Sequence, residues 1–224
     1  LYHGECDPID DPIRYGVFCS FFGKLYIGPI VSAQQFVPQL DDPQMTAEGI
    51  TRGMVQYLRG LAKIVILAGS LQELITQWET LLSLEVTILG TWLHVLCYIF
   101  YIYFTLSGYS DMAIGLGRIF GFHFIENFNY PYISASVTEF WRRWHISLST
   151  WFREYVYIPL GGNRKGLGRQ LLNIAIVWFL TGLWHGASWN FVLWGVYYAV
   201  LLLLEKTFLL QWLDRLPAVV GHIY

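Results

Sequence analysis

The sequence predicts an all-α membrane protein that crosses the bilayer several times. Of its 224 residues, 55% are hydrophobic and only 13% are charged, whereas soluble domains carry about 25% charged residues. The mean hydropathy is +0.43. Two long runs, residues 86–107 and 170–204, contain no Asp, Glu, Lys or Arg. A hydrocarbon core of about 30 Å needs about 20 residues of helix, so both runs are long enough to span a membrane.

The first half of the chain predicts loops alternating with apolar helices. Leu1–Pro12 and Gln39–Thr46 are polar and predict loops, and Arg14–Val31 predicts a short membrane helix that stops at Gly28-Pro29. From Ala47 to about Thr76, apolar residues recur every three or four positions, which predicts an amphipathic helix at the membrane surface or with its basic end at an interface. Val86–Ser107 predicts a spanning helix, and the small and polar residues from Ser107 to Asp111 end its apolar character.

The second uncharged run is too long for one crossing and contains Gly182, Gly186 and Asn190. It predicts two helices, near Leu171–Trp184 and Trp189–Leu204, joined by a tight bend, or one helix broken around His185. Irregular backbone at membrane depth persists only where protein or a water-filled cavity satisfies it. Either arrangement puts His185 beside such a feature.

Thr138–Val156 predicts one helix lying at the membrane interface, with an aromatic stripe on one side and polar residues on the other. Glu139 precedes Arg143 by four residues, a favourable ion-pair spacing. His145 falls at the edge between the two faces. From this helix alone, an interfacial histidine chosen for its amphipathic shape is favoured over a site residue. The helix ends in a turn at Tyr157–Asn163.

Basic residues cluster before the second uncharged run. By the positive-inside rule this region faces the cytoplasm. Their role is either to hold that topology or to attract an anionic cytosolic donor. The cluster consists of Arg142, Arg143, Arg153, Arg164, Lys165 and Arg169.

His185 is the main candidate for chemistry, because an ionisable group in a membrane segment is costly and by default functional. Its reference pKa near 6.5 suits proton transfer at neutral pH; the alternative is a hydrogen bond that joins two helices. Asp111 either binds substrate or caps a turn. Cys6, Cys19 and Cys97 form no CxxC pair, and no motif indicates a metal centre, a bound cofactor or nucleic-acid recognition.

Four ordered motifs resemble the membrane-bound O-acyltransferase family, in particular its bacterial branch that contains the alginate O-acetyltransferase membrane subunit. The likeness also extends over residues 21–40, so it covers almost the whole chain. The motifs are Ser107-Gly-Tyr-Ser-Asp-Met-Ala-Ile-Gly-Leu-Gly117, Glu139-Phe-Trp-Arg-Arg-Trp-His-Ile-Ser-Leu-Ser149, Ile158-Pro-Leu-Gly-Gly-Asn-Arg164 and Gly182-Leu-Trp-His-Gly-Ala-Ser-Trp189.

The resemblance implies that His185 is the catalytic base and that His145 is the second site histidine, both lining a tunnel through the bilayer. It implies acetyl-CoA as donor, an extracytoplasmic polysaccharide as acceptor, a periplasmic partner similar to SGNH hydrolases, and a multi-pass location in the bacterial inner membrane among its lipids. Arg142, Arg143, Asp111 and Trp184 are the candidates for binding substrate or donor.

Members of that family are longer, so we expect residues 1–224 to be one acyltransferase domain, the catalytic middle of a longer protein. Two other functions remain open. A buried histidine also serves transporters and proton relays, and a non-catalytic subunit that recruits a periplasmic enzyme fits the same helices.

Overall fold

The computed structural model describes residues 9–21, 28–82, 86–213, 215 and 222, and these contain helices and no strand. This confirms the all-α prediction. The chain divides into two compact units, Leu1–Glu126 and Asn127–Tyr224, and each unit is described by itself.

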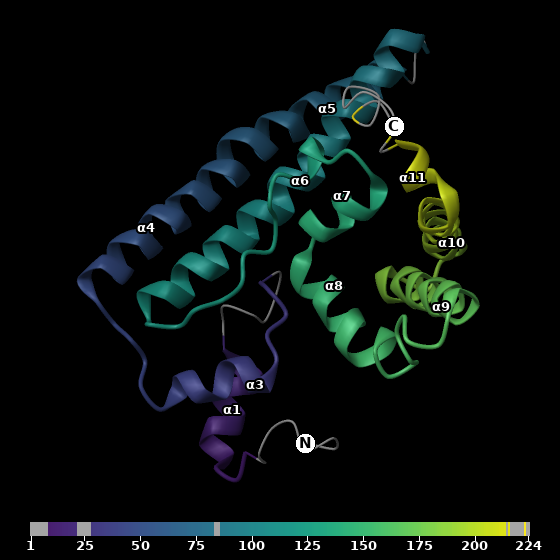
Figure 1. The fold of residues 1–224 in the computed structure, drawn as a ribbon. Coiled ribbons are helices and arrows are strands. Elements are labelled where there is room, and N and C mark those ends of the chain that lie inside the picture. Colours follow the sequence, from purple (N-terminus) through teal and green to yellow (C-terminus); the bar gives the residue numbers. More distant parts are fainter. Residues whose placement is uncertain (1–8, 22–27, 83–85, 214, 216–221, 223–224) are drawn as a thin grey trace. The chain divides into compact units, whose positions relative to one another are not determined.

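The first unit is dominated by two long helices that run alongside each other (Figure 1). One is continuous through α4, a π-helical turn η2 and α5; the other is α6. The helices of this unit are α1 (Pro12–Ser20), α3 (Ala33–Phe36), the 3-10 turn η1 (Val37–Leu40), α4 (Ala47–Ala62), η2 (Lys63–Ala68), α5 (Gly69–Leu82) and α6 (Ile88–Ile119).

Glycines set the close packing of α4 against α6. A Cβ atom on Gly60 would lie 2.5 Å from the carbonyl oxygen of Gly108, and one on Gly115 would lie 2.6 Å from that of Gly53. Small residues let two helix backbones approach closely in this way. The small residues at which the apolar run ends form a helix contact, and α6 continues past them to Ile119.

Two other predictions for this unit differ from the structure. Helix α1 has nine residues and begins at Pro12, inside the predicted loop; residues 22–27 of the predicted membrane helix lie outside the described part. The helix that begins at Ala47 runs on through α5, beyond Thr76, and is long and apolar enough to span a membrane. The polar loop after Leu40 is confirmed, although Gln39 and Leu40 belong to η1.

An aromatic core joins the segment before α4 to the end of α6. Phe36 is fully buried and stacks on Phe122 with ring centroids 5.2 Å apart. Phe21 meets the edges of Phe122 and Phe124, and Ile114 of α6 belongs to the same cluster.

The second unit contains two short helices followed by a hairpin of two long ones (Figure 1). The hairpin confirms the prediction of two helices joined by a bend near His185. The helices are the 3-10 turn η3 (Pro131–Ile133), α7 (Val137–Arg143), α8 (Ile146–Phe152), the π-helical turn η4 (Arg153–Tyr157), α9 (Leu167–His185), α10 (Trp189–Leu204), the π-helical turn η5 (Glu205–Leu209) and α11 (Leu210–Leu213).

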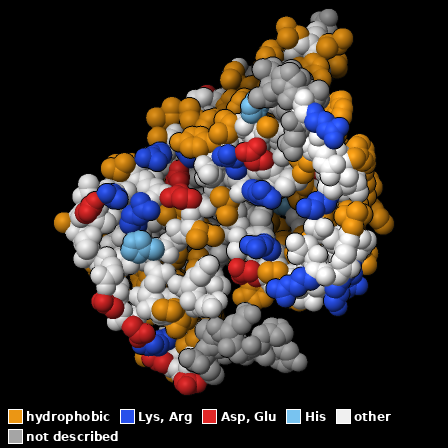
Figure 2. Space-filling model, in the orientation of Figure 1, with side chains coloured by type: hydrophobic (Ala, Val, Ile, Leu, Met, Phe, Trp, Pro, Cys, Tyr) orange, Lys and Arg blue, Asp and Glu red, His pale blue; other side chains and the backbone are white. Residues whose placement is uncertain are grey.

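Four helical stretches of the described residues are long and apolar enough to cross a membrane: Ala47–Leu81, Ile88–Ile119, Leu167–His185 and Trp189–Leu213. Most of their large hydrophobic side chains are exposed in this chain. Figure 2 shows such side chains along the outer edge of α4 and α5. Exposed apolar surface of this extent is what a lipid-facing helix requires.

Candidate functional site

The site begins at a break between α7 and α8. The single helix predicted over Thr138–Val156 is wrong: α7 ends at Arg143 and α8 begins at Ile146. Between them His145 adopts φ 46° and ψ 55°, in the left-handed region. For an L-residue other than glycine this conformation costs about 1–2 kcal/mol, so the surrounding structure must hold it.

The segment around Asn127 holds this break in place. The backbone N–H of Ile146 donates to the carbonyl oxygen of Asn127 at 2.9 Å, and the N–H of Asn129 donates to the carbonyl oxygen of Arg143 at 2.9 Å. The Asn127 side-chain oxygen accepts from the backbone N–H of Ser147 at 3.0 Å and from its hydroxyl at 2.9 Å. Asn127 and Ser147 are both buried. Hydrogen bonds from a segment earlier in the sequence thus fix the backbone on each side of His145.

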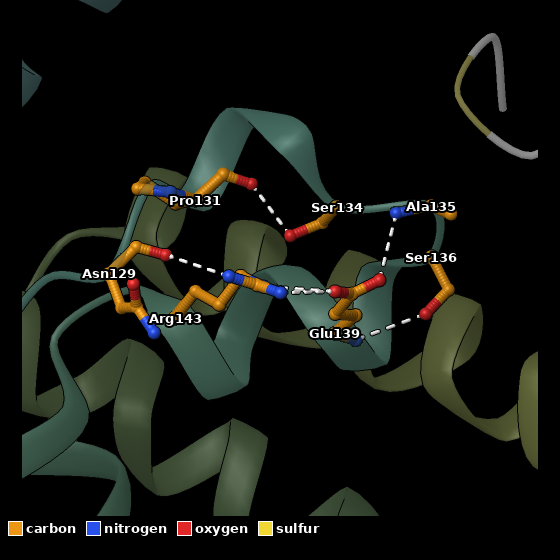
Figure 3. Close-up of polar contacts among 7 residues, drawn as sticks. All are labelled: Asn129, Pro131, Ser134, Ala135, Ser136, Glu139 and Arg143. Carbon is orange, nitrogen blue, oxygen red and sulfur yellow. Dashed lines mark hydrogen bonds and ion pairs between the residues drawn. The ribbon is translucent and has the colours of Figure 1, made fainter.

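Polar contacts around α7 fix its orientation (Figure 3). The predicted pair of Glu139 and Arg143 is confirmed, with 2.8 Å between Oε1 and Nη2. Arg143 also donates to the carbonyl oxygen of Asn129 at 3.2 Å. A hydrogen bond from the Ala135 N–H, followed by Arg143, lowers the pKa of Glu139. Arg143, predicted to bind the substrate or the acyl donor, is therefore held by Glu139 and Asn129 within its own unit.

His185 is the last residue of α9, where Gly186 turns the chain with φ 156°. Gly182 allows α10 to approach, since a Cβ there would lie 2.6 Å from the carbonyl oxygen of Phe191. The His185 ring stacks on Phe191 at 6.0 Å and meets the edge of Trp194 at 4.9 Å between centroids. The side chain remains exposed, so the hairpin holds the imidazole and leaves it accessible.

In the structure the rings of His145 and His185 contact the same indole, that of Trp184. The Trp184 ring centroid lies 6.2 Å from that of His145 and 5.0 Å from that of His185. Burial, and then the proximity of His185, lower the pKa of His145 to about 4. The buried Nδ1 of His145 has no hydrogen-bond partner among the described residues. At neutral pH, His145 is therefore an uncharged imidazole beside an accessible one.

Aromatic rings attach α7 to the hairpin that carries His185. The indole of Trp141 lies 4.6 Å from Trp178 of α9, 5.6 Å from Trp194 and 4.9 Å from Tyr198 of α10, measured between ring centroids. Trp141, an aromatic residue of α7, therefore packs against both helices of the hairpin.

Two other predicted site residues, Asp111 and Arg142, belong to different units. Asp111 belongs to the first unit, in the middle of α6, where it caps no turn; its carboxylate accepts from Nζ of Lys63 at 2.7 Å. Arg142 is exposed on α7. The remaining basic residues of the cluster are exposed as well, and among the described residues no group of His, Cys, Asp or Glu is arranged to hold a metal ion.

Comparison with known proteins places this site in a family. The model of the membrane-bound O-acyltransferase family matches residues 11–215, almost the whole chain. The chain belongs to this family. It is 41% identical over 206 residues to a probable alginate O-acetylase of Azotobacter vinelandii, which covers 92% of this chain and 41% of the relative.

More distant relatives differ in the acceptor or acyl group that their names state. A peptidoglycan O-acetyltransferase of Helicobacter pylori is 36% identical over 199 residues, 88% of this chain and 38% of the relative. A teichoic acid D-alanyltransferase of Bacillus subtilis is 36% identical over 122 residues, 51% of this chain and 31% of the relative. The chain thus spans about two fifths of the length of the alginate and peptidoglycan relatives.

Proposed function

We propose that this protein is a membrane O-acyltransferase that moves an acetyl group from cytosolic acetyl-CoA toward an extracytoplasmic polysaccharide, with His185 as general base. The observation that carries the proposal is that an accessible His185 and a half-buried, neutral His145 both contact Trp184. Membership of the acyltransferase family supports the reaction class.

The reaction needs a base because a hydroxyl is a weak nucleophile until its proton is removed. In this scheme a ring nitrogen of His185 takes the proton as the hydroxyl oxygen attacks the thioester carbonyl carbon. The new C–O bond forms, the carbonyl becomes an oxyanion, and the C–S bond breaks as the carbonyl reforms. The proton held by His185 then passes to the departing thiolate, which leaves as the free thiol of coenzyme A.

His145 suits a different role in the same step. Its lowered pKa keeps the ring uncharged at neutral pH, so one ring nitrogen carries a proton and the other does not. A neutral N–H held in a fixed position can donate to the developing oxyanion without any reorganisation. The strained backbone at φ 46° fits such a role, because strain of this kind often persists at functional sites.

The names of the relatives support a polysaccharide acceptor, since two of them act on alginate or peptidoglycan. We extend this to an exported polysaccharide at the bacterial inner membrane, with a periplasmic partner similar to SGNH hydrolases that completes the transfer. The exposed Arg142 is then available for the phosphates of coenzyme A, whereas Asp111 keeps a structural role through its ion pair with Lys63.

The test is His185→Ala in cells that produce the whole protein and export the polysaccharide. Loss of a general base should lower acetyl transfer by about 100- to 10,000-fold at unchanged protein level, measured as O-acetyl groups per sugar residue. His123→Ala is the matched control, because His123 is exposed in the first unit and should leave acetylation unchanged.

Two results would overturn the assignment. Full acetylation in His185→Ala cells would show that His185 is not the base and would favour a subunit that only recruits the enzyme. Flux of a substrate through reconstituted protein without release of coenzyme A thiol would favour a transporter.

A further inference from the structure

The carboxylate of Glu205 is buried in the second unit and binds the beginning of α7. Glu205 directly follows α10 and is only 1% exposed. Its Oε1 accepts from the backbone N–H of Val137 at 2.7 Å, and its Oε2 accepts from the N–H of Thr138 at 2.8 Å and from the Thr138 hydroxyl at 2.5 Å. Burying a carboxylate is costly unless hydrogen bonds compensate it, and here three donors do so.

These bonds complete the N-terminus of α7. The first backbone N–H groups of a helix lack partners within the helix. In α7 the N–H groups of Val137 and Thr138 donate to Glu205, while those of Glu139 and Phe140 donate to the side chain and carbonyl of Ser136. The negative charge of the carboxylate also interacts favourably with the positive end of the helix dipole.

Helix α7 has only seven residues, so local hydrogen bonds alone do not stabilise it. It is attached at two places, through Glu205 of η5 at its first turn and through Trp141 against Trp194 and Tyr198 of α10. Its other end, Arg143, is two residues before His145. The same α10 packs on His185 through Trp194.

We propose that Glu205 is a positioning residue for the histidine pair, because its carboxylate fixes α7, and therefore His145, on the hairpin that carries His185. Glu205 touches neither histidine and acts through the helix. The inference rests on the proposed function for its effect on turnover, whereas its effect on the position of His145 is measurable without any acyl transfer.

The test compares Glu205→Gln with Glu154→Gln in the whole protein. Glu154 is an exposed glutamate of the same unit and is the matched control. Glutamine removes the charge and replaces one acceptor oxygen with an NH2 group that faces donors. Small misplacements of a catalytic group lower turnover strongly, so Glu205→Gln should reduce kcat by about tenfold or more and change the KM for acetyl-CoA by less than about twofold.

The second readout is the reaction of His145 with diethylpyrocarbonate at neutral pH, located by mass spectrometry. Glu205→Gln should make His145 react several-fold faster, because it loosens the segment that buries the ring, while the exposed His123 should react at the original rate. Equal His145 rates in Glu205→Gln and Glu154→Gln would overturn the proposal. An active His185→Ala variant would overturn the catalytic assignment and leave this readout intact.

Thr138→Val keeps the test decisive if Glu205→Gln does not fold. It removes only the hydroxyl donor and leaves two of the three bonds to Glu205. We expect an intermediate loss of kcat and an intermediate rise in His145 reactivity. Wild-type values for both in Thr138→Val, measured in folded protein, would count against the proposal.

Discussion

Asn127→Ala should destabilise the second unit far more than an exposed asparagine substitution does. The Asn127 side-chain oxygen accepts both the N–H and the hydroxyl of Ser147, and neither residue is more than 2% exposed. Alanine leaves two buried donors without their acceptor. Each unsatisfied buried donor costs about 1–3 kcal/mol, so the free energy of unfolding should fall by about 3 kcal/mol.

Thermal unfolding in detergent micelles, followed by tryptophan fluorescence, measures this effect. For a chain of this size, about 2–4 °C of Tm corresponds to 1 kcal/mol, so Asn127→Ala should lower Tm by on the order of 6–12 °C. Ser147→Ala removes only the hydroxyl donor and should cost about 1 kcal/mol. Asn163→Ala is the control, because Asn163 is exposed in a turn and should change stability by less than about 0.5 kcal/mol. Equal Tm values for Asn127→Ala and Asn163→Ala would refute the role assigned to the Asn127 side chain.

Two further predictions concern the histidine and the helix contact. Because the pKa of His145 falls from 6.5 in the unfolded chain to about 4 in the fold, the unfolded chain binds the extra proton first as pH falls. The contribution of the uncharged His145 to the free energy of unfolding is therefore fully present above pH 6.5 and is lost as the pH falls toward 4. The loss is about 3 kcal/mol at most, at roughly 1.4 kcal/mol per pKa unit. A His145→Gln variant whose Tm falls as steeply as that of the wild type over this pH range would contradict the prediction. Gly60→Ala puts a Cβ 2.5 Å from the carbonyl oxygen of Gly108 and should lower the free energy of unfolding by about 1–3 kcal/mol. Gly16→Ala, with no atom within 4 Å of the new Cβ, is the control and should leave it unchanged. Equal Tm values for the two variants would show that the close contact of α4 and α6 at Gly60 does not contribute to stability.

Local pattern was sufficient to locate α6, α9 and α10 and to single out His185. The hairpin of α9 and α10 lies within one or a few residues of the predicted ranges, because an uncharged run of that length with glycines in its middle has few other solutions. His185 was identifiable because it is an ionisable group in such a run. Its pairing with His145 was implied by the family resemblance, and no periodicity indicated it.

Local pattern failed where a distant segment supplies the competing contact. The aromatic stripe and the polar face over Thr138–Val156 favour one helix, but the N–H of Ile146 donates to the carbonyl oxygen of Asn127 and not to a carbonyl of its own helix. In α6 the small residues end the apolar run, and only the facing glycines of α4 show that they form a helix contact. Whether a small residue ends a helix or allows another to approach depends on what lies opposite.

The sequence by itself determined that this is a helical membrane protein of the acyltransferase family and which two histidines to examine. Hydrophobic length and residue order are local properties, so they can be read along the chain. Only the tertiary structure decided that His145 occupies a strained break, that Asn127 holds that break, and that Glu205 completes the start of α7. Each of these depends on a hydrogen bond between residues 19 or more positions apart, and such bonds are decided by how the chain packs.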